Sequence, residues 1–178
     1  PMLYRVDLET NIISQWDMGT PFIMTINPNQ TWLALVFAGV YQQQEGKIQV
    51  LSLFSDELTP QQVMTFPAIS GASHDGYYPP IQWLNEDIAR VAIPHPDALY
   101  LAETPLMTQL WEFQTDTSLT ALGELKNTHL LLSPLWSADG EKLAYLEYSQ
   151  STSTFFVMNS DLSAVHYTAT PTQPEPFF

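Results

Sequence analysis

The stretch LLLSPLWSADGEKLAYLEY, residues 130–148, decides the fold because it joins two apolar runs through a tight turn. The turn is built on Asp139 and Gly140, and an Asp-Gly pair supplies the positive φ that a tight hairpin turn needs. In the second run, large side chains alternate along the chain, as they do in β-strands. This stretch is therefore predicted to form an antiparallel hairpin.

The same unit occurs three times along the chain. Each copy consists of an apolar run, a polar turn and a second apolar run, in residues 22–37, 80–93 and 132–148. Alignment of the turns places three residues at equivalent positions, at intervals of 57 and 53 residues: Asn27, Leu84 and Ser137. A repeat of this length is typical of propellers and solenoids.

A second hairpin unit, with an acidic turn, follows each copy of the first unit and also precedes the first copy. It occupies residues 3–16, 48–66, 110–125 and 155–169. Its turn carries one shared acidic position, which is Asp7, Asp56, Asp116 and Asp161 in the four copies. Aspartate favours turns because its carboxylate accepts hydrogen bonds from nearby backbone amides, so we interpret these residues as turn formers rather than catalysts.

Two hairpins per repeat make four antiparallel strands, which is the composition of a propeller blade. The predicted fold is all-β, with blades at about 22–66, 80–125 and 130–169, an outer half-blade at 3–17 and a tail at 170–178. Together they amount to about three and a half blades, which form a single β-propeller segment. Since propellers close with at least about four blades, we expect an incomplete propeller or part of a larger one. Self-association or the remainder of a longer chain would complete it.

The third repeat resembles the repeat of TolB-type β-propellers, a WD40-like family. The family pattern is approximately P-x-W-S-P-D-G-K-x-[IL]-A-[FY], followed by a strand of the L-Y-V-M-N type and an acidic turn. The chain matches this pattern at Pro134, Trp136, Ser137, Asp139, Gly140, Lys142, Leu143, Ala144, Tyr145, Val157, Met158, Asn159 and Asp161. Ala138 stands where the family usually has proline. The resemblance implies an extracytoplasmic location, either periplasmic or secreted.

Composition excludes several classes of function. With 45% hydrophobic and 12% aromatic residues, the chain has the composition of a globular domain. The net charge of −14 repels phosphate backbones, so we expect no nucleic-acid partner. No apolar run approaches the roughly 20 residues that span a bilayer. Because the chain has no cysteine, disulfides, thiolate metal sites and cysteine nucleophiles are all excluded.

The densest group of reactive side chains is Ser73, His74 and Asp75. Neighbours in an extended loop point to alternate sides, so they rarely converge into a Ser-His-Asp triad, and no G-x-S-x-G elbow occurs. His74 with Asp75, or His95 with Asp97, would offer two metal ligands at most, without a helix-spaced pair or a calcium-loop ladder. We therefore predict no catalytic residue, no metal and no cofactor.

The second repeat is longer than the others, and its extra residues fall between Pro94 and Thr108. Loop insertions are where propellers usually place function, so HPDALYLAETPLMT is the leading candidate for a partner-binding loop. Its candidate contact residues are His95, Asp97, Tyr100 and Glu103. A structural role in the repeat is predicted for Trp83, Trp136, Asp139 and Gly140.

The predicted function is a non-enzymatic propeller module that binds a protein or peptide partner. The alternative is an accessory domain of a larger hydrolase or peptidase, because TolB-like propellers resemble the gating domains placed before α/β-hydrolase peptidases. In that case the nucleophile lies outside these residues. A lectin-like or sialidase-like propeller is disfavoured because no S-x-D-x-G-x-T-W box occurs. The first hypothesis rests on the repeat pattern, on the lack of a convergent catalytic set and on analogy of fold.

Overall fold

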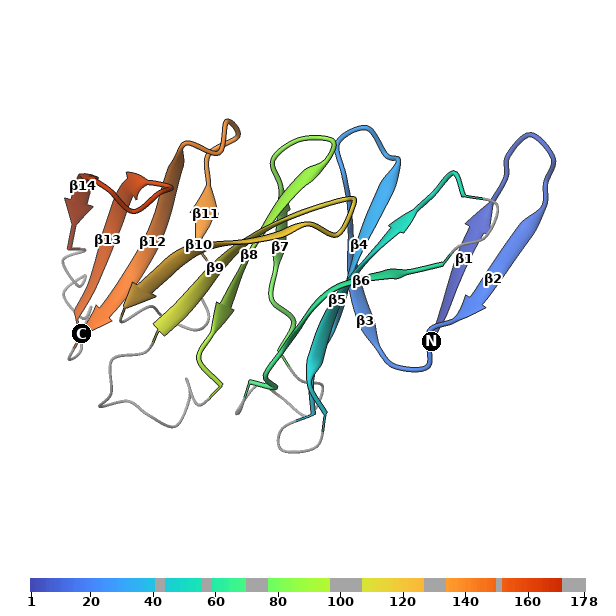
Figure 1. Ribbon diagram of the computed structural model, residues 1–178, viewed down its shortest axis with the longest axis horizontal. Helices are drawn as coiled ribbons and strands as arrows, with labels where there is room; N and C mark the ends of the chain where they lie inside the picture. Colours follow the sequence, from blue (N-terminus) through green and yellow to red (C-terminus); the bar gives the residue numbers. More distant parts are fainter. Residues whose placement is uncertain are drawn as a thin grey trace, which may run out of the picture.

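The computed structural model describes residues 1–40, 44–55, 59–69, 77–96, 107–126, 134–149 and 152–170. Within these ranges the chain forms strands β1 to β14 and no helix. Figure 1 shows the strands grouped into sheets that stand side by side in the order of the sequence. The expected all-β fold with four-stranded antiparallel propeller blades is confirmed.

Each sheet is an antiparallel meander. The N-terminal hairpin consists of β1 (Met2–Val6) and β2 (Ile13–Asp17). Blade 1 consists of β3 (Phe22–Ile26), β4 (Trp32–Phe37), β5 (Gly46–Ser52) and β6 (Gln61–Phe66). Blade 2 consists of β7 (Ile81–Trp83), β8 (Ile88–Pro94), β9 (Met107–Gln114) and β10 (Leu119–Lys126). Blade 3 consists of β11 (Leu135–Trp136), β12 (Lys142–Ser149), β13 (Thr152–Asn159) and β14 (Val165–Ala169).

The first turn of every blade has the same hydrogen-bond pattern. The backbone N–H groups of the three aligned residues, Asn27, Leu84 and Ser137, each donate to a carbonyl at the start of the next strand, at 3.0, 2.9 and 3.0 Å. The acceptors are Trp32, Ile88 and Lys142. These turns lie at the upper edge in Figure 1, whereas β8 ends and β9 begins at the lower edge.

Apolar side chains fill the space between neighbouring sheets. In β4, Leu33 and Leu35 pack toward the N-terminal hairpin, whereas Ala34 and Val36 pack toward blade 2. Successive side chains of a strand point to opposite faces, so a strand covered on both sides needs apolar residues at every position. This explains the uninterrupted apolar run of β4. A further cluster, which includes Leu143, joins blades 2 and 3.

Blade 3 is covered on one face only by the described residues. Leu143 and Tyr145 of β12 pack toward blade 2, whereas Ala144 and Leu146 on the opposite face are half-buried. On that second face Leu135 is 65% exposed. Both faces of 142–148 carry large apolar side chains, which predicts burial on both faces. The second face is only partly buried because no further sheet follows blade 3 within the described part of the chain.

Candidate binding surface

The structure describes only the stem of the predicted partner-binding loop. Pro94 of β8 pairs with Thr108 of β9 at its base. His95 is exposed, while Asp97, Tyr100 and Glu103 lie outside the described residues. The recognition role of this loop stays a prediction. Ser73, His74, Asp75 and Asp56 also lie outside the described residues.

The four residues with a predicted structural role make contacts within and between blades. Trp83 lies edge-on against Phe113, with ring centroids 6.1 Å apart, and Trp136 is 5% exposed between blades 2 and 3. Asp139 accepts hydrogen bonds from the Ser137 hydroxyl and from the Glu141 amide. The adjacent Gly140 has φ of 72°, in the left-handed region that favours glycine.

Aspartates of the hairpin turns accept hydrogen bonds from backbone amides. Asp7 accepts from Glu9 and Thr10, at 2.9 and 3.0 Å, and the amides of Thr10 and then Glu9 lower its pKa. A serine hydroxyl is the first cause of a lowered pKa at three further turn aspartates, and a backbone amide is the second. These are Asp116, Asp139 and Asp161, with donors Ser118, Ser137 and Ser163. Each aspartate thus stabilises its turn when its carboxyl group is ionised.

Acid is expected to destabilise the fold through these turns. The pKa of these carboxyl groups is lower in the folded chain than the value of 3.8 in the unfolded chain. Their ionised form therefore stabilises the fold above about pH 3.8, and this stabilisation is lost as the pH falls through the folded pKa. Replacement of the four aspartates by asparagine removes the titration. Thermal unfolding followed by circular dichroism should show the wild-type chain more stable than this variant at about pH 6, with the gap closing at about pH 2.5.

Salt of about 0.5 M in both samples screens the self-repulsion of a chain with net charge −14. Two stability curves that stay parallel between these pH values would contradict the prediction.

Amide side chains connect neighbouring blades. Asn27 is 1% exposed, and its Oδ1 accepts from the backbone amides of Thr31 and Trp32 at 2.8 and 2.9 Å. Its Nδ2 donates across to the Glu86 carbonyl of blade 2, at 2.7 Å. Sequence reasoning found Asn27 as a turn residue but missed this bond, because it joins residues 59 apart.

Gln82 of β7 binds the backbone of the next blade with both amide atoms. Its Nε2 donates to the Trp136 carbonyl at 2.7 Å, and its Oε1 accepts from the Trp136 amide at 2.9 Å. The side chain therefore pairs with β11 as a strand would. A glutamine between apolar residues of a short strand was the only sequence signal for this contact.

Two arginine side chains also connect neighbouring sheets. Arg90 donates to Glu112 Oε2 from Nε at 2.9 Å and from Nη2 at 2.8 Å, while its Nη1 donates to the Gly140 carbonyl of blade 3 at 2.7 Å. Arg5 of β1 donates to the Leu53 and Ser55 carbonyls at 3.2 and 2.9 Å. Both are structural contacts. The signal for Arg90 is a single cation inside an otherwise apolar strand, IARVAIP.

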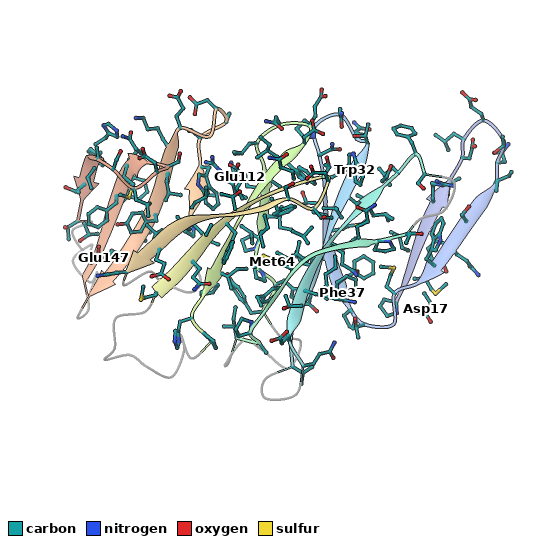
Figure 2. All side chains as sticks on the ribbon, viewed as in Figure 1. Asp17, Trp32, Phe37, Met64, Glu112 and Glu147 are labelled. Atoms are coloured by element: carbon teal, nitrogen blue, oxygen red, sulfur yellow. The ribbon has the colours of Figure 1, made fainter. Side chains whose placement is uncertain are left out.

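A cavity of about 180 Å³ lies between the N-terminal hairpin and blade 1. Figure 2 shows Phe37 and Asp17 in this region of the molecule. The ammonium of Lys47 lies 4.4 Å from the centroid of the Phe37 ring. The cavity is lined by Leu3, Trp16, Asp17, Met18, Phe37, Lys47, Gln49, Leu51 and Pro60. It thus combines aromatic walls with one cation, one amide and one carboxylate.

The same end of the molecule exposes apolar side chains of β1 and β3. Tyr4 is 57% exposed, and Met24 and Ile26 are 58% and 46% exposed. Met24 and Ile26 pair with Leu35 and Leu33 on the face of blade 1 that is turned toward the N-terminal hairpin. The hairpin has only two strands and covers this face in part. Uncovered apolar surface of this kind marks interaction sites.

The described ranges contain neither a metal-binding cluster nor a membrane-spanning helix. There, no group of three or more His, Asp or Glu side chains is arranged to hold a metal ion. Over the same described part of the chain, no helix is long and apolar enough to cross a membrane. What the described residues offer is a cavity and uncovered apolar surface.

The sheets and the polar groups that bridge their seams define a β-propeller type of architecture. Its blades resemble an acylaminoacyl peptidase solved in complex with Z-Gly-Gly-Phe-chloromethyl ketone, with a TM-score of 0.55 and 12% identity over 97% of this chain. This chain spans 30% of the length of that peptidase. At this identity the likeness concerns the fold alone.

A second similar structure is the β-propeller domain of the Trilobed protease from Pyrococcus furiosus, described as having an open velcro topology. Its TM-score is 0.45 at 14% identity, and the match covers 85% of this chain and 43% of that one. Comparison of the sequence with protein-family models and with curated proteins found no match.

Proposed function

We propose that this chain is a non-enzymatic β-propeller module, of the TolB-type suggested by its third repeat, that binds a protein or peptide partner. The observation that carries the proposal is the uncovered apolar surface beside the N-terminal hairpin, where Met24 and Ile26 are about half exposed. Apolar surface of this kind is covered between the other blades. The loop that begins at His95 is proposed as a second contact region.

The free edge of β1 supplies the polar half of this binding surface. The Met18 amide donates to the Pro1 carbonyl and the Asp7 amide donates to the Ile12 carbonyl. Hydrogen-bonded and non-hydrogen-bonded pairs alternate along an antiparallel ladder, so the backbone groups of Met2, Tyr4 and Val6 point away from β2. An extended partner segment would pair with them and lay its apolar side chains over Met24 and Ile26.

Besides a separate protein or peptide partner, two sources of the segment concern the chain itself: a second copy of it, or the remainder of a longer chain. Sedimentation velocity at micromolar concentration separates them, because only the first gives concentration-dependent association of the purified chain. A stable monomer that binds no apolar-surface dye would contradict the proposal, since its uncovered faces would then need no occupant.

Partner binding is tested by capture from a native lysate followed by rebinding of the purified candidate. The variant Met24→Glu/Ile26→Glu should weaken rebinding by about tenfold or more, because each carboxylate would be buried without a partner. Gln61→Glu/Gln62→Glu, at two exposed positions of β6, serves as the control because it adds the same two negative charges. Rebinding that is equal for the wild type and the double variant would place the partner elsewhere.

The alternative is an accessory propeller domain of a larger hydrolase or peptidase. It is raised by the likeness of the fold to the acylaminoacyl peptidase, of which this chain spans 30%. Under this alternative the isolated chain hydrolyses no peptide, and the gene encodes a G-x-S-x-G domain beyond the propeller. The sequence of the complete gene decides between the two.

A further inference from the structure

We propose that the cavity between the N-terminal hairpin and blade 1 binds an aromatic ring that carries a carboxylate. The source of this group is a free aromatic acid or the carboxyl-terminal aromatic residue of a peptide. The proposal goes beyond the partner surface described above, because Met24, Ile26 and Tyr4 do not line the cavity.

The cavity lies where the other blades place an aromatic side chain. Equivalent positions follow from the strand pairing, because the second residue of β4, β8 and β12 in each case packs toward the preceding sheet. The residues two positions further along these strands are Leu35, Val91 and Tyr145. Their partners on the next strand are Gln49, Trp111 and Phe156, respectively. Blade 1 thus has Gln49 where blades 2 and 3 have Trp111 and Phe156.

The next position on the same face differs as well. Lys47 pairs with Phe37, whereas the equivalent residues are Gln109 in blade 2 and Thr154 in blade 3. Compared with blades 2 and 3, blade 1 therefore lacks one aromatic ring, at Gln49, and has one additional cation, at Lys47. These two positions are neighbours on the same face of β5. Such a departure from the repeat is where a functional site is expected, because the repeat itself explains only the structural residues.

The size and walls of the cavity suit one ring. The cavity measures about 180 Å³, opens to solvent and has both polar and apolar lining. Its volume admits one ring, because about 150 Å³ is enough to hold benzene. Phe37 and Trp16 offer aromatic walls. The Trp16 wall is held in place from β1, since the Arg5 guanidinium lies 5.7 Å from the Trp16 ring centroid and also binds the Leu53 carbonyl.

The polar end of the cavity selects a carboxylate. No carboxylate lies within ion-pair distance of the Lys47 ammonium among the described residues, although acidic side chains far outnumber basic ones. Gln49 adds an amide beside it. Asp17 also lines the cavity, but its Oδ1 accepts from the Gly19 amide and its side chain is 72% exposed. Because Asp17 carries the same charge as the ligand, the bound carboxylate is expected to lie on the Lys47 side of the cavity, away from Asp17.

The test uses 3-phenylpropionate and its neutral amide, titrated into the purified chain by calorimetry and by ¹H–¹⁵N shift mapping. The acid should bind with Kd on the order of 1 mM or tighter, and the amide about tenfold more weakly. Gln49→Phe restores the ring of the other blades and should abolish binding of both probes. Lys47→Gln restores the side chain of blade 2 and should make acid and amide bind equally weakly.

Lys126→Gln is the matched control, because it removes the same charge at an exposed position of β10 and should leave both affinities unchanged. Equal affinity of the wild-type chain for acid and amide would overturn the proposal, and so would undiminished binding to a folded Gln49→Phe variant. Should that variant fail to fold, Lys47→Gln still decides. The absence of saturable binding at several millimolar would also overturn the proposal.

The peptide Ala-Ala-Phe distinguishes the two sources. Binding as tight as that of the free acid supports a peptide terminus, whereas binding of the free acid alone supports a small molecule, and both outcomes support the shared chemistry. Failure of this site leaves the partner-binding proposal standing, because that proposal is measured through variants of Met24 and Ile26, outside the cavity.

Discussion

Replacement of Asn27 by leucine is expected to lower the free energy of unfolding by about 2–4 kcal/mol. The side chain is 1% exposed and accepts from the amides of Thr31 and Trp32 while donating to the Glu86 carbonyl. Leucine has a similar volume but no polar atom, so the Trp32 amide and the Glu86 carbonyl lose this partner, and the Thr31 amide keeps only its longer bond to Asn29 Oδ1. Urea unfolding followed by tryptophan fluorescence measures the change.

Two further variants separate the roles of Asn27. Asn29→Ala removes an exposed turn residue whose Oδ1 accepts from the Thr31 amide at 3.3 Å, and should change stability by less than about 1 kcal/mol. Asn27→Asp keeps an acceptor oxygen for the turn but turns a carboxylate oxygen toward the Glu86 carbonyl, so its loss combines the missing bond between blades with the cost of a buried charge. An Asn27→Leu chain as stable as Asn29→Ala would show that the buried amide contributes nothing.

The fold could be predicted from the sequence because its determinants are local. An Asp-Gly turn and alternating apolar residues specify the hairpin around Gly140 within fewer than twenty positions. The recurrence of that hairpin then indicates the blade. Hydrogen bonds between distant positions could not be predicted from the sequence. One example is the bond from Gln82 to Trp136, whose partners are 54 residues apart.

The cavity could not be predicted from the sequence either, because it also depends on which distant positions pair. Gln49 is unremarkable in a strand until the register shows that Trp111 and Phe156 occupy its place in the other blades. A β-bulge after Ile48 changes the pairing of β5 with β6 at this point, and such an irregularity has no clear mark in the sequence. For the loop 95–108, the sequence feature that predicts a recognition role is its extra length.

Replacement of Arg90 by methionine is expected to lower the free energy of unfolding by about 2–4 kcal/mol. The Arg90 and Glu112 side chains are 12% and 21% exposed, so Glu112 would be left as a largely buried carboxylate without its partner. The Gly140 carbonyl would lose its donor, and the Trp136 ring would lose the guanidinium that lies 5.9 Å from its centroid. Arg5→Met is the comparison, because Arg5 binds two carbonyls and leaves no carboxylate unpaired.

The double variant Arg90→Met/Glu112→Leu decides why the single change is harmful. If the cost comes from an unpaired carboxylate, removal of both charges should recover most of the lost stability, because apolar side chains of similar volume then fill the site. If it comes from the bond to the Gly140 carbonyl, the double variant should be as unstable as Arg90→Met. We expect recovery of more than about half of the loss, since an unpaired buried charge costs more than one hydrogen bond to a backbone carbonyl. Urea unfolding of the wild type, the two single variants and the double variant closes this cycle, and a coupling energy near zero would show that Arg90 and Glu112 stabilise the seam independently.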